Sequence, residues 1–394
     1  MADYAAFEPN PPFDYTDMSI RLVEDAYFAT QRDQCPVMRS SSFGGFWALT
    51  KYADVAWAAQ DHEHFSTADG PTIPSFDRPF ESKPLSSDPP EHGKYRKLLQ
   101  PFFTPAAVAQ MEPLVRTIVV DKIKSIADRH EADFMKELGE PVPAEVMAIT
   151  LGLGRERGRE ISFMNQSAHH SATHGDRAAS AAARASMLSF LTREIESRRK
   201  SPTGDLLSTI VHSEVDGEPV TDEIRYGMAT MLIVAGTDTT VSGITNALAV
   251  LACEPHFKRG LLEDSRQLDA FINESLRFDA PLLGLARTVR ESVCVRGAQF
   301  EVGDRVLLLW GSGNHDPERF SDPDTFDPHR QQISNLTFGY GRHRCLGDHL
   351  AKLEIRIVIE EVLARMPDFR VASGKPLPLR NDLERGPSSL PVVW

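Results

Sequence analysis

Apolar residues recur at spacings of three and four along most of the chain, which is the periodicity of amphipathic helices. The segments that follow it are Pro105 to Arg129, Pro143 to Leu151, Arg177 to Arg199, Thr221 to Cys253, Ser265 to Arg277 and Asp348 to Met366. Short runs of branched and aromatic residues predict strands at Phe46 to Leu49, Val293 to Val295 and Arg305 to Trp310, with Val295 to Phe300 as the turn of a hairpin. The pattern predicts a mainly α fold with a small, mostly antiparallel β region.

The segment from Thr221 to Cys253 is the longest of these helices. Thr221 is a suitable N-cap, and at 1.5 Å per residue the helix would be about 48 Å long, enough to cross the whole molecule. Its apolar stretch from Met228 to Ala235 is far shorter than the roughly 20 residues of a membrane span. We therefore expect this helix to run through the interior of a protein without a membrane anchor.

Four polar residues, Thr237, Asp238, Thr239 and Thr240, interrupt the middle of this helix directly after Ala235 and Gly236. Polar residues at mid-helix cost stability unless they face solvent or a site, and their side chains can bend the helix by hydrogen-bonding its backbone. One interpretation is a surface face whose hydroxyls bond back to the preceding turn. The other is a functional site inside the molecule, which we favour because a protein of this size buries its longest helix.

Composition narrows the class of protein. The chain has 394 residues, with 43 Lys and Arg against 56 Asp and Glu, and a net charge of -13 argues against a nucleic-acid partner. No repeat or low-complexity linker divides it, so we expect a single domain over residues 1–394, with the Pro/Ser-rich segment Pro71 to Pro90 as a long functional loop.

Cysteine usage and the N-terminal segment predict a cytoplasmic protein. Four scattered cysteines, Cys35, Cys253, Cys294 and Cys345, do not form a disulfide framework or a CxxC metal motif. Residues 1–15 carry acidic residues and prolines instead of the basic and apolar regions of a signal peptide.

Cys345 lies in the sequence FGYGRHRCLG, directly before the helix predicted from Asp348. A lone cysteine is most often a small buried apolar side chain. Here Arg342, His343 and Arg344 surround it, and these charges together with the start of the following helix would lower its pKa and favour a thiolate, a known ligand of haem iron. A nucleophilic cysteine paired with His343 is a weaker alternative, because residues two apart cannot easily face each other.

This loop resembles the haem-binding loop of the cytochrome P450 family, and Phe338, Gly339, Gly341, His343, Cys345 and Gly347 fill every position of its motif. The resemblance implies the cytochrome P450 fold, a triangular helical domain with a long central helix over haem b (iron protoporphyrin IX). It further implies that Cys345 is the axial iron ligand, that Phe338 packs beside its sulfur, and that His343 binds a haem propionate.

The polar segment of the long helix resembles the oxygen-binding kink of the same family. The resemblance implies that Gly236 gives room above the iron and that Asp238 and Thr239 are the acid-alcohol pair that delivers protons to dioxygen, the co-substrate. Proton delivery of this kind requires a carboxylate and a hydroxyl. The pair therefore predicts a monooxygenase.

Two further groups of residues match the family. The first is its buried ion-pair network, formed by Glu274, Arg277 and Arg330, to which we assign a structural role. The second is its set of propionate-binding cations, for which the matching positions are His92, Arg96 and Arg287. Any one of these charges could instead be solvated.

The resemblance also indicates a substrate pocket lined by apolar residues. These are Phe76, Phe80, Met231, Val234, Ala235, Gly236, Leu282, Leu283, Leu285 and Leu390. The segment from Gln331 to Glu354 and the C-terminal LPVVW are similar to the camphor-hydroxylase branch, which favours a compact, terpenoid-like substrate, with aromatic acids and steroids left open. His169, His170 and His174, whose spacing is compatible with metal ligands, fall where the family places a mobile lid, and we interpret them as channel residues.

The family places electron transfer in separate proteins, and this chain shows no flavin or nicotinamide domain. The resemblance implies an acidic ferredoxin and its reductase, with NAD(P)H as the ultimate donor. A basic patch of Lys94, Lys97, Arg342, Arg344 and Lys352 on the cysteine side could bind such a partner. We expect a monomer. A non-catalytic haem-thiolate sensor or gas-binding protein is the alternative, against which Asp238 and Thr239 argue.

Overall fold

The computed structural model describes residues 12–74, 80–173, 177–331, 334–372 and 376–394. The helices are α1 (Met18–Arg21), α2 (Glu24–Gln34), α3 (Tyr52–Gln60), α4 (Glu91–Leu99), α5 (Pro105–Ile126), α6 (Pro141–Thr150), α7 (Gly158–Thr173), α8 (Arg177–Lys200), α9 (Leu206–Val211), α10 (Asp222–Cys253), α11 (Pro255–Glu263), α12 (Leu268–Phe278), α13 (Trp310–Asn314) and α14 (Asp348–Arg365). The mainly helical fold that the sequence predicted is confirmed.

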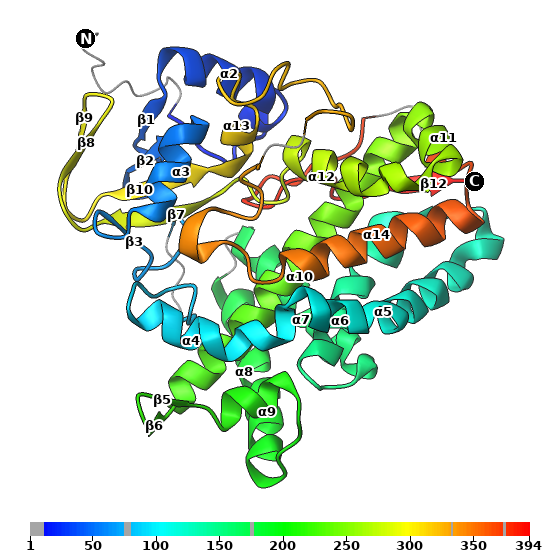
Figure 1. The fold of residues 1–394 in the computed structure, drawn as a ribbon, viewed down its shortest axis with the longest axis horizontal. Helices are drawn as coiled ribbons and strands as arrows, with labels where there is room; N and C mark the ends of the chain where they lie inside the picture. The colour runs from blue at the N-terminus through cyan, green and yellow to red at the C-terminus, as the bar shows by residue number, and fades with distance from the viewer. Residues whose placement is uncertain (1–11, 75–79, 174–176, 332–333, 373–375) are drawn as a thin grey trace.

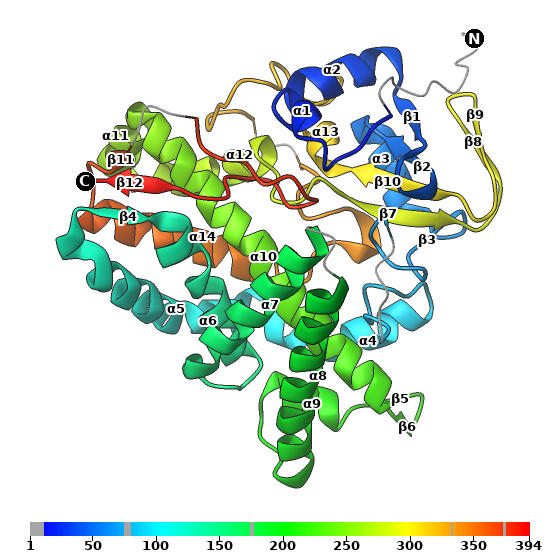
Figure 2. The same cartoon turned by 180° about the vertical axis from the view of Figure 1, so that it is seen from behind.

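The strands are short and gather mostly in one part of the molecule, beside α1 to α3 (Figures 1 and 2). They are β1 (Val37–Ser40), β2 (Phe46–Leu49), β3 (Phe65–Ser66), β4 (Glu131–Asp133), β5 (Glu214–Val215), β6 (Glu218–Pro219), β7 (Gly284–Val289), β8 (Val293–Val295), β9 (Ala298–Phe300), β10 (Arg305–Leu309), β11 (Arg370–Val371) and β12 (Pro391–Val393). The main sheet has the order β1-β2-β10-β7-β3, in which only β2 and β10 run parallel.

The central helix agrees closely with its sequence pattern. The Thr221 hydroxyl accepts the N–H of Ile224 and caps α10, with Asp222 and Glu223 in the first turn, where acidic side chains complement the helix dipole. The helix continues unbroken to Cys253. It packs against α6, α12 and α14 and crosses the middle of the helical part of the molecule (Figure 1).

Other boundaries differ by small amounts. The first three residues of the segment predicted from Ser265 form a 3-10 turn before α12, and α6 begins at Pro141 instead of Pro143 because proline is well suited to the first turn of a helix. The predicted hairpin forms from β8 and β9, but its turn is confined to Arg296 and Gly297, both of which have positive φ, because residues 298–300 of the predicted turn form β9. Helices such as α2, α3 and α7 were not predicted.

Apolar side chains form one large core and two smaller ones. The large core joins α5, α6, α10 and α14, and the smaller cores lie on the two faces of the main sheet. No helix within the described ranges is long and apolar enough to cross a membrane.

Candidate active site

Cys345 lies between a 3-10 turn (Gly341–His343) and the start of α14. Gly339 and Gly341 both have φ near +70°, which folds the loop back so that the Cys345 N–H donates to the Phe338 carbonyl at 2.8 Å. The side chain is densely surrounded by protein, yet its surface is exposed. The sulfur is therefore accessible to a ligand even though protein surrounds it.

The pKa of this thiol differs from the sequence-based expectation. Burial raises it above the ordinary value, and this outweighs the lowering effects of the Gly347 amide, which hydrogen-bonds the thiol, and of Arg96 and Arg344. Arg344 is paired with Asp348, whose charge opposes the thiolate. The prediction that the neighbouring charges and the helix start lower this pKa is thus wrong for the protein without a bound ligand, because burial dominates.

Cationic groups from two distant segments, α4 and β7, converge beside this loop. His92 and His343 lie with their ring centroids 4.2 Å apart, and Arg287, on β7, lowers the pKa of His343 through its charge. Burial is the main cause that lowers the pKa of His92 to about 4 and that of His343 to about 2. Arg96 extends from α4 and donates to the Arg344 carbonyl at 2.8 Å, so α4 is tied to the cysteine loop.

The two arginines in this group carry positive charge that nearby carboxylates, Asp88 for Arg287 and Asp348 for Arg96, balance only in part. Arg287 is only 3% exposed, it donates to the Ala286 carbonyl, and burial lowers its pKa to about 10. Burial also lowers the pKa of Arg96. Among the residues that the structure describes, no carboxylate forms an ion pair with either guanidinium. Buried cations without partners are costly, so this arrangement calls for two anionic groups.

The residues fit haem, the cofactor that the resemblance implies. Haem carries two negatively charged propionates, which would pair with the positive charges of Arg96 and Arg287. Cys345 has the accessible sulfur that an iron ligand needs. His92 and His343, neutral at physiological pH, would donate hydrogen bonds to the same carboxylates.

The polar segment of α10 combines features of both sequence interpretations. The hydroxyls of Thr237, Thr239 and Thr240 donate to carbonyls four residues earlier, at 2.8, 3.0 and 3.3 Å, as expected for hydroxyls that bond back to the preceding turn. Thr237 and Thr240 are nevertheless buried, so this is no surface face. Thr239 and Asp238 are partly exposed. The expected kink does not interrupt the helix.

Neighbouring residues show which side of α10 is open. Val234 is 45% exposed and Ala235 is also exposed, although α10 crosses the interior. A Cβ on Gly236 would instead lie 2.0 Å from Cε of Met147 on α6. Gly236 thus serves the close packing of α6 on α10, and the expectation that it gives room above the iron requires correction, because Ala235 occupies the open face.

The apolar residues expected around the substrate divide into two groups. Phe80, Met231, Leu282 and Leu285 are partly exposed and lie on segments that border the open face of α10 or the main sheet. Leu283 and Leu390 are at most 1% exposed and belong to the apolar cores, so they line no accessible wall. Phe76 and His174 lie outside the described residues, as do the side chains of His169 and His170.

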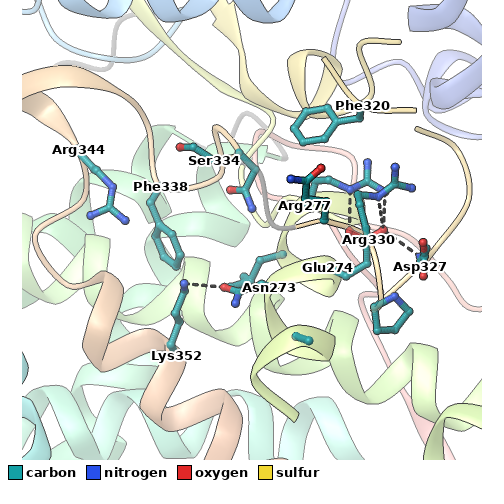
Figure 3. A pocket seen from close by; sticks show the side chains of 15 residues that line it. Asn273, Glu274, Arg277, Phe320, Asp327, Arg330, Ser334, Phe338, Arg344 and Lys352 are labelled. Atoms are coloured by element: carbon teal, nitrogen blue, oxygen red, sulfur yellow. Dashed lines mark hydrogen bonds and ion pairs between the residues drawn. The ribbon is translucent and has the colours of Figure 1, made fainter. Parts of the chain in front are cut away.

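Glu274, Arg277 and Arg330 form a compact ion-pair network. Oε1 and Oε2 of Glu274 accept from Nη2 and Nε of Arg277 at 2.7 and 2.8 Å, and Nε of Arg330 lies 3.4 Å from Oε1 (Figure 3). Arg277 also donates to the carbonyls of Asn314 and Pro323. The network thereby holds α12 against the segment that leads to the cysteine loop.

This network forms one wall of a polar hollow of about 240 Å³ on the side of the cysteine loop. Phe338 and Lys352 form the opposite wall, and Nζ of Lys352 donates to Oδ1 of Asn273 at 2.6 Å (Figure 3). Arg344 borders the same hollow. Three of the five expected basic residues thus have partners within the protein, because Lys94 is paired with Asp216 and Arg344 with Asp348. Lys97 and Arg342 are exposed.

Two residues of the site escaped the sequence analysis. Oγ1 of Thr67 lies 3.5 Å from Nε2 of His343, and the Asp88 carboxylate accepts hydrogen bonds from Thr67. Asp88 could have been suspected, since it directly precedes the two prolines before α4. Nothing in the sequence around Thr67 distinguishes it.

Comparison with known proteins places these features in context. Residues 171–382 match the family model described as Cytochrome P450. The chain is 32% identical over 355 residues to Cytochrome P450 130 of Mycobacterium tuberculosis, covering 88% of each chain. It is 31% identical over 364 residues to the Steroid C26-monooxygenase of Mycolicibacterium smegmatis, covering 91% of this chain and 90% of that protein. The structure is also similar to Cytochrome P450 CYP109Q5 from Chondromyces apiculatus, with a TM-score of 0.86, 31% identity and 97% of each chain covered.

Proposed function

The chain belongs to the cytochrome P450 family, and from this membership we propose that it is a ferredoxin-dependent enzyme that hydroxylates or epoxidises a compact hydrophobic molecule. As a cytochrome P450 monooxygenase it uses haem b and takes dioxygen as co-substrate. The haem, when bound, supplies the oxygen chemistry. The non-catalytic sensor is set aside, because the similar proteins include a named monooxygenase.

The observation that carries the site assignment is a pair of arginines beside an accessible cysteine, neither of which has an ion-pair partner among the described residues. In our proposal Cys345 binds the iron, while Arg96, Arg287, His92 and His343 bind the propionates. These groups come from three separate segments of the chain, namely α4, β7 and the cysteine loop, so their convergence does not follow from any local pattern.

Asp238 and Thr239 are assigned to proton delivery. Both are partly exposed and follow Val234 and Ala235, which mark the open face of α10. The Thr239 hydroxyl donates to the Ala235 carbonyl at 3.0 Å, which leaves its oxygen able to accept a further hydrogen bond. A carboxylate one residue away can exchange protons with solvent and with this hydroxyl through water.

The substrate is proposed to be apolar and compact, such as a terpenoid or a steroid. The exposed Val234 and the partly exposed Met231, Leu282 and Leu285 support an apolar wall. The steroid monooxygenase relative, 31% identical, makes steroids a substrate class to test beside terpenoids.

The electron donor is proposed to be an acidic ferredoxin that binds the face formed by Lys97, Arg342 and Arg344. These side chains are exposed and surround the cysteine loop, and α4 is joined to that loop by Arg96. Positive charge on this face of an acidic protein would attract and orient an acidic partner. A cytoplasmic monomer remains our expectation.

The first test is the absorption spectrum of the reduced protein with and without carbon monoxide. A strongly red-shifted Soret band is expected for thiolate-ligated haem, and the same band should be absent from Cys345→Ala. Titration of the ferric protein with terpenoids, steroids and aromatic acids should then show a spin-state shift for the proposed substrate class. A histidine-type haem spectrum would contradict the assignment of Cys345.

A further inference from the structure

Asp88 joins the long loop before α4 to the edge strand of the main sheet. One carboxylate oxygen, Oδ1, accepts from the Thr67 N–H at 3.0 Å and from Thr67 Oγ1 at 3.2 Å, and Oδ2 accepts from the Ser66 hydroxyl. Ser66 ends β3, which pairs with β7, the strand that carries Arg287. The Asp88 carbonyl also accepts from the His92 N–H at 2.9 Å. One residue thus contacts the elements that position both His92 and Arg287.

The charge of Asp88 faces the cationic group. Its carboxylate favours the protonated forms of both Arg287 and His92, against the opposing effect of burial. The Thr67 hydroxyl, which contacts the carboxylate, lies 3.5 Å from His343 Nε2. Asp88 is therefore the acidic neighbour of two of the four groups to which we assign propionate binding, Arg287 and His92, and it is linked to a third, His343, through Thr67.

Hydrogen bonding alone does not require an acid at this position. The carboxamide oxygen of an asparagine could accept from Thr67 and tie the loop to β3. A carboxylate adds a negative charge in a partly buried region, where charges act over longer distances than in water. A variant that keeps the hydrogen bonds between the loop and β3 but lacks the charge can therefore separate the effect of the charge on the iron from the effect of those hydrogen bonds.

We propose that Asp88 is a positioning residue of the haem site whose negative charge limits the excess of positive charge around the propionates and thereby lowers the reduction potential of the haem. The inference rests on the proposed function, since it presupposes haem at Cys345. A fixed negative charge favours the ferric form over the ferrous form, which carries one positive charge less. Removal of this charge should make one-electron reduction easier.

The test is a spectroelectrochemical titration of the holoenzyme and a set of variants. Asp88→Asn should raise the midpoint potential, and Asp88→Glu, which keeps the charge, should return it toward the wild-type value. Thr67→Val removes a hydrogen bond to the carboxylate but not the charge, so its potential should stay close to wild type. Asp69→Asn is the matched control, because Asp69 is exposed and pairs with Arg290. Any shift in that control should vanish at high salt, whereas the Asp88→Asn shift should persist.

Three results would overturn the proposal. Asp88→Asn could bind haem normally with an unchanged potential, Thr67→Val could shift the potential as much as Asp88→Asn, or Asp88→Glu could fail to restore it. If Asp88→Asn loses its haem, Asp88→Glu decides between the two roles. If Asp88→Glu keeps its haem at the wild-type potential, the charge is what matters. If both variants lose their haem, Asp88 only holds the loop to β3 and the proposal fails. The wild-type carbon monoxide spectrum is recorded first, because an absent thiolate band would contradict the haem site itself and not specifically Asp88.

Discussion

The Glu274 carboxylate accepts two hydrogen bonds from the Arg277 guanidinium, at 2.7 and 2.8 Å, and both residues are at most 5% exposed. A third contact from Arg330 and the N–H of Asp327, which donates at 3.0 Å, complete the coordination of the carboxylate. The pair is three residues apart on α12, yet its partners lie more than thirty residues further along the chain. It therefore holds together segments that local structure alone does not join.

Glu274→Gln should destabilise the protein strongly. The substitution leaves two guanidinium groups buried without an anion, and breaking such a buried pair typically costs about 3 to 5 kcal/mol. Chemical denaturation followed by circular dichroism measures the loss, and haem content of the purified protein should fall with it. Glu318→Gln is the matched control, because Glu318 pairs with Lys51 but its side chain is 62% exposed. An exposed pair contributes about 0 to 1 kcal/mol, so a similar loss in both variants would contradict the structural role of the network.

Thr239→Ala should uncouple oxygen consumption from product formation. The variant should keep the helix, because alanine has the highest helix propensity, but it removes the hydroxyl that lies on the open face. Positioned proton transfer typically contributes about 10²- to 10⁴-fold to a rate, so product formed per NAD(P)H consumed should fall by at least about tenfold while hydrogen peroxide rises.

The neighbouring Thr240 provides the control for this experiment. Its hydroxyl donates to the Gly236 carbonyl and is buried, so Thr240→Ala alters the same helix turn away from the open face. Thr239→Ser should retain most of the coupling. Equal uncoupling in Thr239→Ala and Thr240→Ala would indicate a general disturbance of α10.

Because of the buried Glu354, the free energy of unfolding should fall as pH rises. Glu354 is 2% exposed on α14, its Oε2 has no hydrogen-bond partner among the described residues, and burial raises its pKa well above the ordinary value. The folded state therefore keeps a proton that the unfolded chain releases near pH 4.3. Between these two pKa values the free energy of unfolding falls with increasing pH, by up to about 1.4 kcal/mol per unit for one proton, and it levels off above the folded pKa.

Denaturant titrations of the wild type and of Glu354→Gln from pH 5 to pH 8 measure this effect. The glutamine side chain carries no titrating proton, so the difference between the two unfolding free energies should grow in favour of the variant as pH rises. A difference that is constant with pH would show that Glu354 titrates alike in both states.

The sequence predicted most reliably those features that depend on neighbouring residues. The cap at Thr221, the hairpin turn at Arg296 and the glycines around Cys345 all depend on local backbone preferences, and the structure contains each of them. The same holds for Glu274 and Arg277, which share a helix face by spacing alone.

Features that depend on distant contacts were missed or placed incorrectly. Whether Leu283 and Leu390 face a cavity or a core depends on strands and loops far away in sequence, and both are buried. Whether the Cα of Gly236 faces the open side of α10 or α6 depends on where Met147 of α6 packs. The part played by Asp88 depends on the pairing of β3 with β7, two strands separated by more than 200 residues. Single-residue patterns contain no information on such pairings.

Charge reversal at Arg342 should slow reduction by an acidic ferredoxin. Arg342 is exposed in the turn before Cys345, so Arg342→Glu changes the field on that face without removing a buried contact. Rim charges act mainly on association rates, and the second-order rate of reduction should fall by roughly threefold at low salt and approach the wild-type rate at high salt. Lys200→Glu, at the exposed end of α8, is the control for net charge. Stopped-flow reduction measures both, and equal slowing would argue against docking at the cysteine face.

Gly227→Ala should loosen the loop that covers α10. A Cβ at this position would lie 2.0 Å from the Glu81 carbonyl oxygen and 3.4 Å from Cβ of Phe80, and the first contact is with backbone, which cannot rotate away. The ring of Phe80 also packs on Tyr226, with centroids 5.4 Å apart. The methyl group must therefore push residues 80 and 81 off the helix and weaken this ring contact.

We expect substrate to exchange faster in Gly227→Ala, with a higher dissociation rate and a several-fold weaker affinity, because Phe80 is one of the expected pocket residues. The spin-state change on mixing with substrate in a stopped-flow instrument measures both rates. Gly260→Ala is the matched control, since Gly260 lies inside α11 with no atom within 4 Å of a new Cβ. That variant should gain about 0.5 to 1 kcal/mol of stability from improved helix propensity and leave substrate exchange unchanged. If Gly227→Ala instead exchanged substrate at the wild-type rate, the loop would have to adjust elsewhere, and its seat on α10 would not control access to the pocket.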